Sequence, residues 1–259
     1  MIIGAYQFAV TGNIDHNFRA IKQAIISASK KRVKLLVFPE CALTGYPPRD
    51  IEHSSSIDLR YMDLCCNELA QLAKTYGMHI VVGAITKHDE YYYNSAIVFT
   101  PTQDRMIYNK RALWGWDTEN FCPGDQIGVF GIDRLRIGVR ICYEVRFPEY
   151  FRELYLQNTD LNIILFYDVS DNDDTERYEL IRSHIRTRAV ENVCHTLSVN
   201  ATCTFQTAPT ALFDKSGRPL AELDRNTDDL LVYDLELSQL DFGEQGRKEI
   251  SDTLTKRSI

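Results

Sequence analysis

The sequence predicts an α/β protein in which helices cover a mixed sheet or two sheets. In the first half of the chain, segments with apolar residues at helical spacing alternate with short apolar runs typical of buried strands. In the second half, strand-like segments follow one another in pairs. Alternation of this kind favours layers of helix packed on sheet. No internal repeat, low-complexity tract or Pro/Gly/Ser-rich linker interrupts the pattern, so we expect a single domain over residues 1–259.

The N-terminal half contains the clearest periodic segments. Phe18, Ile21 and Ile25 recur at helical spacing, and the run KLLVF is typical of a buried strand. Prolines after this run force a loop. In order, we expect a strand at 2–8, a helix at 17–31, a strand at 34–38, a helix at 58–76 ended by Gly77, strands at 79–86 and 93–100, and a short strand at 105–108.

The C-terminal half begins with an irregular segment that contains a Pro-Gly pair. In order, we expect irregular chain at 110–125, a strand at 135–141, a helix at 148–157 with Pro148 in its first turn, a strand at 162–166, a helix at 175–192, and strands at 195–200, 207–213 and 230–235. The tail from residue 237 onward is polar, and we expect Gly243 and Gly246 to break any regular element there.

Composition and charge restrict the classes of function. Of the 259 residues, 44% are hydrophobic and 25% charged, which is typical of a globular enzyme or binding protein. A net charge of −7 argues against a nucleic-acid-binding surface, which needs clustered basic residues. No apolar run of about 20 residues is present to span a membrane, and the N-terminus lacks the features of a signal peptide.

The cysteines indicate a reducing compartment. There are seven, an odd number, and no CxxC pair suggests a zinc site. Together with the missing secretion signal, this predicts free thiols and a cytoplasmic protein without a metal. Most of the thiols are expected to be small buried apolar groups.

Three residues suited to catalysis each follow an apolar strand directly. Glu40 follows KLLVFP, Lys110 follows RMIYN and Cys142 follows LRIGVRI. Because sites in open α/β sheets gather at the carboxyl ends of strands, we expect the three side chains to meet at one sheet edge. A thiol nucleophile, a carboxylate base and an ammonium group suit attack on a carbonyl or nitrile carbon with loss of an amine or ammonia.

Each of these residues also has a simpler interpretation. Cys142 alone is typical of a buried core cysteine, Glu40 of a helix cap or loop acid, and Lys110 of a solvated lysine at a strand end. A serine hydrolase is a further alternative, because serines lie near histidines at 183–184 and 195–198. No GxSxG motif supports that alternative.

Longer segments around the three residues resemble motifs of the nitrilase (carbon–nitrogen hydrolase) superfamily. LLVFPECALTGYPPRD resembles its glutamate motif, YNKRALWGWDTENFCPGD its lysine motif, and RIGVRICYEVRFPEYFREL its cysteine motif. RTRAVENVCHTLSVN and LFDKSGRPLAEL resemble later blocks, so the resemblance spans nearly the whole chain. It implies an α-β-β-α sandwich, in which two sheets lie face to face with helices outside.

The resemblance also implies roles for individual residues. Cys142 would be the nucleophile that forms the acyl-enzyme, and Glu40 the general base and acid. Lys110 would stabilise the tetrahedral intermediate together with the backbone N–H of Tyr143. Glu119 would correspond to a second glutamate that positions the substrate in related amidases, the alternative being a plain loop acid. The resemblance implies no metal and no organic cofactor.

Two features near the cysteine motif are interpreted from the residues themselves. Glu144 and Arg146 are expected to form an ion pair that supports the turn after Cys142. After LNIILF the family often has Pro and Trp, whereas this chain has the acidic stretch YDVSDNDDTERYEL. We interpret the stretch as a solvated loop and a helix start, where acids complement the helix dipole. The alternative is a pocket for a cationic or polar amide.

The leading hypothesis is hydrolysis of a small linear amide or N-carbamoyl amine, because CYEVRFPE looks more like the amidase and carbamoylase branches than the nitrilases. Nitrile hydrolysis is an alternative within the class. A glutaminase module that supplies ammonia to a partner synthetase is another, since LTGYPPRD resembles the amidase domain of glutamine-dependent NAD synthetases. A non-catalytic protein on this fold is a third, which the intact Glu–Lys–Cys set argues against. By resemblance we expect a homodimer or higher homo-oligomer formed through the helices at 148–157 and 175–192.

Overall fold

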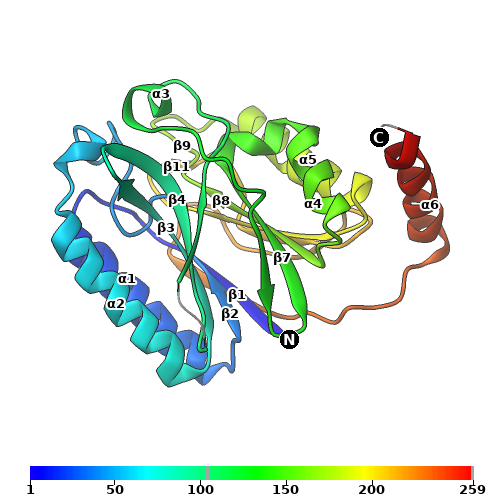
Figure 1. Cartoon of the computed structure of the whole chain (residues 1–259), viewed down its shortest axis with the longest axis horizontal. Coiled ribbons are helices and arrows are strands. Elements are labelled where there is room, and N and C mark those ends of the chain that lie inside the picture. Colours follow the sequence, from blue (N-terminus) through cyan, green and yellow to red (C-terminus); the bar gives the residue numbers. More distant parts are fainter. Residues whose placement is uncertain (103–104, 258–259) are drawn as a thin grey trace.

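The computed structural model describes residues 1–102 and 105–257, and its centre is a pair of six-stranded sheets (Figure 1). The first sheet contains β1 (Ile2–Gln7), β2 (Leu35–Val37), β3 (His79–His88), β4 (Tyr91–Phe99), β5 (Met106–Asn109) and β14 (Asp229–Asp234), in the order β14-β1-β2-β3-β4-β5. The second contains β6 (Val129–Ile132), β7 (Leu135–Ile141), β8 (Leu161–Phe166), β10 (His195–Asn200), β12 (Ala211–Phe213) and β13 (Pro219–Glu222), in the order β13-β12-β10-β8-β7-β6. A short ribbon pairs β9 (Val169–Ser170) with β11 (Phe205–Gln206).

Helices cover the outer faces of both sheets and complete four layers. Figure 1 shows α1 (Ile14–Lys30) and α2 (Leu59–Tyr76) on the first sheet, and α4 (Pro148–Leu156) and α5 (Thr175–Glu191) on the second. Two 3₁₀ turns, at Ser54–Ser56 and Cys142–Arg146, and the short α3 (Asp117–Asn120) lie in connections. The predicted α-β-β-α sandwich is confirmed. No helix in the described part of the chain has both the length and the apolar character needed to cross a membrane.

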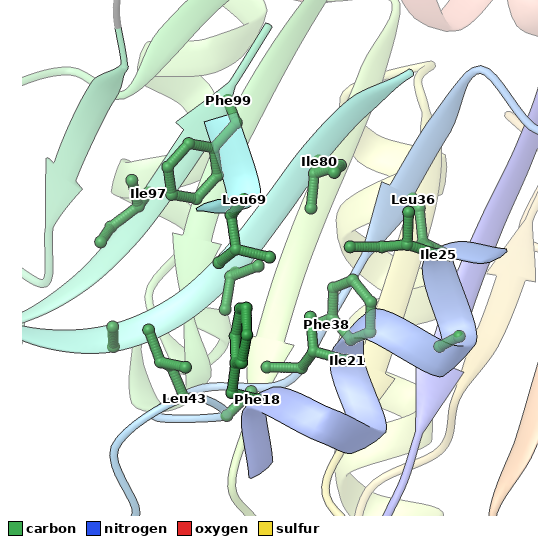
Figure 2. Close-up of a cluster of buried hydrophobic side chains, with 14 of the residues drawn as sticks. Phe18, Ile21, Ile25, Leu36, Phe38, Leu43, Leu69, Ile80, Ile97 and Phe99 are labelled. Carbon is green, nitrogen blue, oxygen red and sulfur yellow. The ribbon is translucent and has the colours of Figure 1, made fainter. Parts of the chain in front are cut away.

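The central strands are apolar runs because both of their faces are buried. In β3, Val81 contributes to the core between the two sheets, whereas Ile80 belongs to the core between the first sheet and its helices. Figure 2 shows this outer core, with Ile21 and Ile25 of α1 packed near Phe38 and Leu36. A strand covered on one face by a sheet and on the other by helices needs no polar side, which explains the run KLLVF.

Caps set the ends of the first two helices. The Asn13 side chain accepts a hydrogen bond from the backbone N–H of His16 and starts α1 at Ile14, three residues before the predicted start at 17. Asp58 caps α2 in the same way, and Gly77 ends it in the left-handed conformation with φ of 55°. Side-chain caps of this kind satisfy N–H groups that the helix itself leaves unpaired.

The prediction for the C-terminal tail is wrong. Residues Phe242–Arg257 form a helix, α6, despite Gly243 and Gly246. Asp241 and Glu244 explain its start, because each accepts a hydrogen bond from the other's backbone N–H. α6 also docks on α4, where the Tyr155 hydroxyl donates to the Lys248 carbonyl oxygen at 3.2 Å. Capping and docking together outweigh the helix penalty of about 1 kcal/mol for each glycine.

Three smaller differences concern the second sheet and the loop before it. β6 and the separate strand β13 are present where the periodicity alone indicated no strand. Within 207–213, only Ala211–Phe213 is extended in the sheet. The irregular segment 110–125 contains the short helix α3. These are edge strands and single turns, whose short length gives little periodic signal.

Candidate active site

The candidate site lies between strand ends that belong to different sheets. Glu40 and Lys110 follow β2 and β5 of the first sheet, whereas Cys142 follows β7 of the second. All three line one cavity of about 540 Å³. The expectation that they meet at the edge of a single sheet is therefore wrong. Packing two sheets face to face brings the ends of their strands together across the interface.

Glu40 lies in a tight turn that packs on β3. The Gly83 backbone N–H donates to the Pro39 carbonyl oxygen at 3.1 Å, and the Leu43 N–H donates to the Gly83 carbonyl at 3.0 Å. A methyl group on Gly83 would lie 2.2 Å from that Pro39 oxygen and 2.6 Å from the Glu40 Cα. No other residue type fits here without displacing the turn. Gly83 thus sets the position of the Glu40 backbone.

We expect Gly83→Ala to reduce kcat/KM for the substrate by about 10²-fold, because a displacement of about 1 Å in a catalytic group has an effect of this size. The matched control is Gly131→Ala. Gly131 also lies in a strand, but a methyl group there would meet nothing within 4 Å. Steady-state kinetics on both variants checks the expectation. Equal activity in the two would show that the Glu40 turn accommodates the methyl group.

The Glu40 carboxylate is part of a buried charge network. Lys110 Nζ donates to Glu40 Oε1 at 2.8 Å and to Asp117 Oδ2 at 2.7 Å, and none of the three side chains is more than 2% exposed. The Asn94 amide donates to Glu40 Oε1 at 2.7 Å, and the Tyr167 backbone N–H to Oε2 at 2.8 Å. Donors therefore reach both carboxylate oxygens and hold the group in one orientation.

Burial and mutual charge set the protonation of this network. Burial raises the pKa of the Glu40 carboxyl above its ordinary value, and the Lys110 ammonium only partly opposes that effect. For Lys110, burial would lower the pKa, but the carboxylates of Glu40 and Asp117 outweigh it and raise the pKa well above the ordinary value. The network therefore combines a lysine that stays charged with a carboxylate that burial makes a stronger base than a solvated glutamate.

Cys142 has a strained backbone at the point where β7 ends. Its φ is 46°, in the left-handed region that residues other than glycine seldom adopt, and it begins the 3₁₀ turn Cys142–Arg146. Such outliers persist at functional sites, where the surrounding structure enforces them. Burial and the Glu40 charge raise the pKa of the Cys142 thiol well above its ordinary value, although Lys110 acts in the opposite direction. The sulfur is therefore a thiol at rest and needs a base before it attacks.

Glu144 connects the 3₁₀ turn Cys142–Arg146, the cysteine turn, to residues 110–112, the lysine loop. Its Oε1 accepts from the Tyr108 hydroxyl and the Arg111 backbone N–H, each at 2.7 Å, and its Oε2 accepts from the Ile141 N–H at 2.7 Å. The expected ion pair between Glu144 and Arg146 is not formed. The structural role predicted for Glu144 holds, but its partners are donors on β5, the lysine loop and β7. Arg146 instead lies over the Tyr143 ring.

The structure brings Tyr143 to the cavity and leaves Glu119 outside it. Tyr143 lines the cavity beside Cys142. Glu119 is exposed on α3 and does not line the cavity. The acid that α3 directs inward is Asp117, which is also bonded by the Tyr46 hydroxyl at 2.8 Å. The segment WDTEN offers two acids, and only the orientation of the helix distinguishes them.

The remaining cavity wall is aromatic and charged. Trp114 and Trp116 lie at the cavity with about half of each side chain exposed. Three guanidinium groups, from Arg49, Arg146 and Arg177, also line it. Within residues 1–102 and 105–257, no group of three or more His, Cys, Asp or Glu side chains is arranged to hold a metal ion. The wall thus offers stacking surfaces and hydrogen-bond donors to a ligand.

Comparisons with known proteins show what the sequence and the fold are similar to. Residues 2–242 match the family model described as carbon–nitrogen hydrolase. The chain is 32% identical over 149 residues to a nitrilase of Pyrococcus abyssi, covering 57% of each protein. It is 29% identical over 167 residues to an (R)-stereoselective amidase of Pseudomonas sp., covering 64% of this chain and 58% of that amidase. The matches thus span little more than half the length of these relatives. An amidase from Nesterenkonia sp. has the same fold, with a TM-score of 0.81, 24% identity, and coverage of 100% of this chain and 96% of that one.

Proposed function

Because the chain belongs to the carbon–nitrogen hydrolase family, we propose that it hydrolyses the C–N bond of a small linear amide or N-carbamoyl amine through a thioester on Cys142. The observation that carries the proposal is the buried network of Glu40, Lys110 and Asp117 in the same cavity as the strained Cys142. A protonated resting thiol, a nearby carboxylate with a raised pKa and a fixed ammonium are the groups that this reaction needs.

The first half of the reaction forms the thioester. The Glu40 carboxylate takes the thiol proton as Cys142 Sγ attacks the carbonyl carbon. The oxyanion that results is stabilised by the Lys110 ammonium and the backbone N–H of Tyr143. Glu40 then passes its proton to the nitrogen, the C–N bond breaks, and ammonia or an amine leaves.

The second half regenerates the enzyme. Glu40 takes a proton from water, and the hydroxide attacks the thioester carbon. The C–S bond breaks, the proton returns to Cys142, and a carboxylic acid leaves. An amide and one water thus give a carboxylic acid and ammonia, with no oxidant or reductant. The same carboxylate acts as base and then acid in each half, which suits its raised pKa.

In this proposal Asp117, rather than Glu119, is the second acid of the site. Asp117 orients the Lys110 ammonium at 2.7 Å and is buried, whereas Glu119 is exposed to solvent. With a carboxylate on each side, Lys110 keeps its charge throughout the cycle. Its ammonium remains available to the oxyanion because a lysine carries three N–H donors.

Self-association and location are also parts of the proposal. α4 and α5 expose Leu156 and Leu180 on the surface, each with 49% of the residue accessible, which suits a homodimer formed through these helices. All seven cysteines are unpaired, which suits a reducing compartment such as the cytoplasm.

The test is ammonia release from small linear amides, N-carbamoyl amines, glutamine and nitriles, with Cys142→Ala alongside. We expect release from an amide or N-carbamoyl compound and none above background in the variant. A nitrile as the preferred substrate would favour the nitrilase alternative, and glutamine that is cleaved only with an added synthetase would favour the glutaminase alternative. Release that persists in Cys142→Ala would contradict the thioester mechanism.

A further inference from the structure

An ion pair on the cavity wall fixes one arginine at the site. Arg177, in the first turn of α5, donates from Nε to Asp168 Oδ1 at 2.9 Å and from Nη2 to Asp168 Oδ2 at 3.1 Å. Asp168 is 5% exposed and also accepts from the Thr207 hydroxyl. Both residues line the cavity that contains Cys142. Asp168 therefore holds the Arg177 guanidinium in one orientation.

Part of the Arg177 guanidinium remains available to a ligand. A guanidinium has five N–H donors, and the pairing with Asp168 uses one edge of its fork. The side chain is 42% exposed. Its pKa is raised chiefly by the hydrogen bonds to Asp168, which outweigh partial burial. Arg177 and Cys142 line the same cavity, so a ligand in that cavity can lie between the guanidinium and the nucleophile.

The acids of the same wall, in contrast, are already occupied. Asp168 accepts from Arg177 and Thr207, and Asp174 accepts from the Arg177 backbone N–H as the cap of α5. Asp171, which does not line the cavity, is paired with Arg49. The two acids of the stretch that line the cavity therefore do not form a cation pocket, the alternative considered for it, because Asp168 holds an arginine and Asp174 a helix end. The wall presents N–H donors to the cavity.

From this arrangement we propose that the preferred substrate is a small linear amide with a carboxylate at the end remote from the scissile bond, and that Arg177 binds this carboxylate. The inference rests on the proposed amide hydrolysis and adds its substrate class. An arginine fork matches a carboxylate with two parallel hydrogen bonds. Asp168 serves as the positioning residue that orients the fork before the substrate arrives.

Two substrates of nearly equal shape test the proposal. Glutaramate carries a carboxylate, and 4-nitrobutanamide carries a neutral nitro group in its place. We expect the wild-type protein to prefer glutaramate by about 10- to 100-fold in kcat/KM, the effect of hydrogen bonds to a charged group. In Arg177→Gln the preference should disappear, because kcat/KM should fall by a larger factor for glutaramate than for 4-nitrobutanamide, chiefly through a higher KM for glutaramate.

Controls separate binding from folding. Arg182→Gln removes another arginine of α5, which is paired with Glu222 and does not line the cavity, and we expect its substrate preference to be that of the wild type. The double variant Asp168→Asn/Arg177→Gln leaves no unpaired carboxylate and should lose the preference as well. An equal fall for both substrates in Arg177→Gln would show a structural role for Arg177 and overturn the proposal.

Failure of this inference and failure of the proposed function give different results. If the wild type hydrolyses both amides equally through Cys142, the substrate class is wrong and the hydrolase function stands. If no amide is hydrolysed, the proposed function fails. Calorimetry with glutarate then decides on the carboxylate site alone. Binding that is lost in Arg177→Gln supports the site, and absence of binding to the wild type overturns it.

Discussion

Glu40→Gln is expected to reduce kcat/KM by about 10²- to 10⁴-fold, the range for loss of a general base. The amide is nearly isosteric with the carboxylate but cannot take the proton of the Cys142 thiol. That thiol has a raised pKa from burial and from the Glu40 charge, so the sulfur does not ionise without a base. Lys110 keeps Asp117 as a partner in the variant, so we expect the fold to persist. Steady-state kinetics and circular dichroism check the two statements.

The pH profile gives the same prediction an independent readout. Burial raises the pKa of Glu40 above 4.5, and the reaction needs the ionised carboxylate. Activity should therefore fall as the pH decreases through this raised pKa, and the midpoint of the acid limb should lie above pH 4.5. In Glu40→Gln that limb should vanish from the residual activity.

The control for Glu40→Gln is a second buried glutamate, which does not line the cavity. Glu244 is 8% exposed and caps α6, so Glu244→Gln tests the effect of removing a buried carboxylate as such. We expect it to leave kcat/KM unchanged. A loss in Glu40→Gln below about tenfold, with the acid limb unaltered, would exclude Glu40 as the base, since general bases contribute at least 10²-fold.

The sequence predicts the fold well where burial is complete on both faces of a strand. Within KLLVF, the residues of β2, Leu35–Val37, are all apolar, and LNIILF, which forms β8, is apolar except at Asn162, because both strands lie between a sheet and a helix layer. The tail forms a helix despite its two glycines because the Asp241–Glu244 cap and the contact with Tyr155 stabilise it. A contact between distant segments leaves no mark on local periodicity.

The candidate site, like the fold, can be predicted from local sequence only in part. The positions of Glu40, Lys110 and Cys142 after strands are visible in the sequence, and resemblance gives them roles. That they meet across two sheets depends on packing that no single segment encodes. Asp117 and Glu119 are two residues apart on a short helix, so only the helix orientation decides which acid reaches Lys110. Asn94 and the Tyr167 N–H come from β4 and from the chain after β8, with no motif to mark them.

The largest expected effect on stability is that of Glu144→Ala. The variant removes the carboxylate that accepts hydrogen bonds from the Tyr108 hydroxyl and from the backbone N–H groups of Arg111 and Ile141. These three donors then lose their acceptor. Each buried donor left unpaired costs about 1–3 kcal/mol, so we expect a loss of roughly 3 kcal/mol or more in the free energy of unfolding. For a chain of this size, 3 kcal/mol lowers the Tm by about 6–12 °C.

Graded variants show whether the network has this role. Tyr108→Phe removes one donor and leaves Glu144 its backbone partners, so the loss should be about 1 kcal/mol. Glu149→Ala changes an exposed glutamate of the following helix and should shift the free energy by no more than about 0.5 kcal/mol. Since Glu144 joins the lysine loop to the cysteine turn, its loss should also lower kcat at temperatures where the protein is still folded. A Glu144→Ala protein with wild-type Tm and kcat would mean that Lys110 and Cys142 are positioned independently of each other, and that the strained turn at Cys142 is held by the sheet alone.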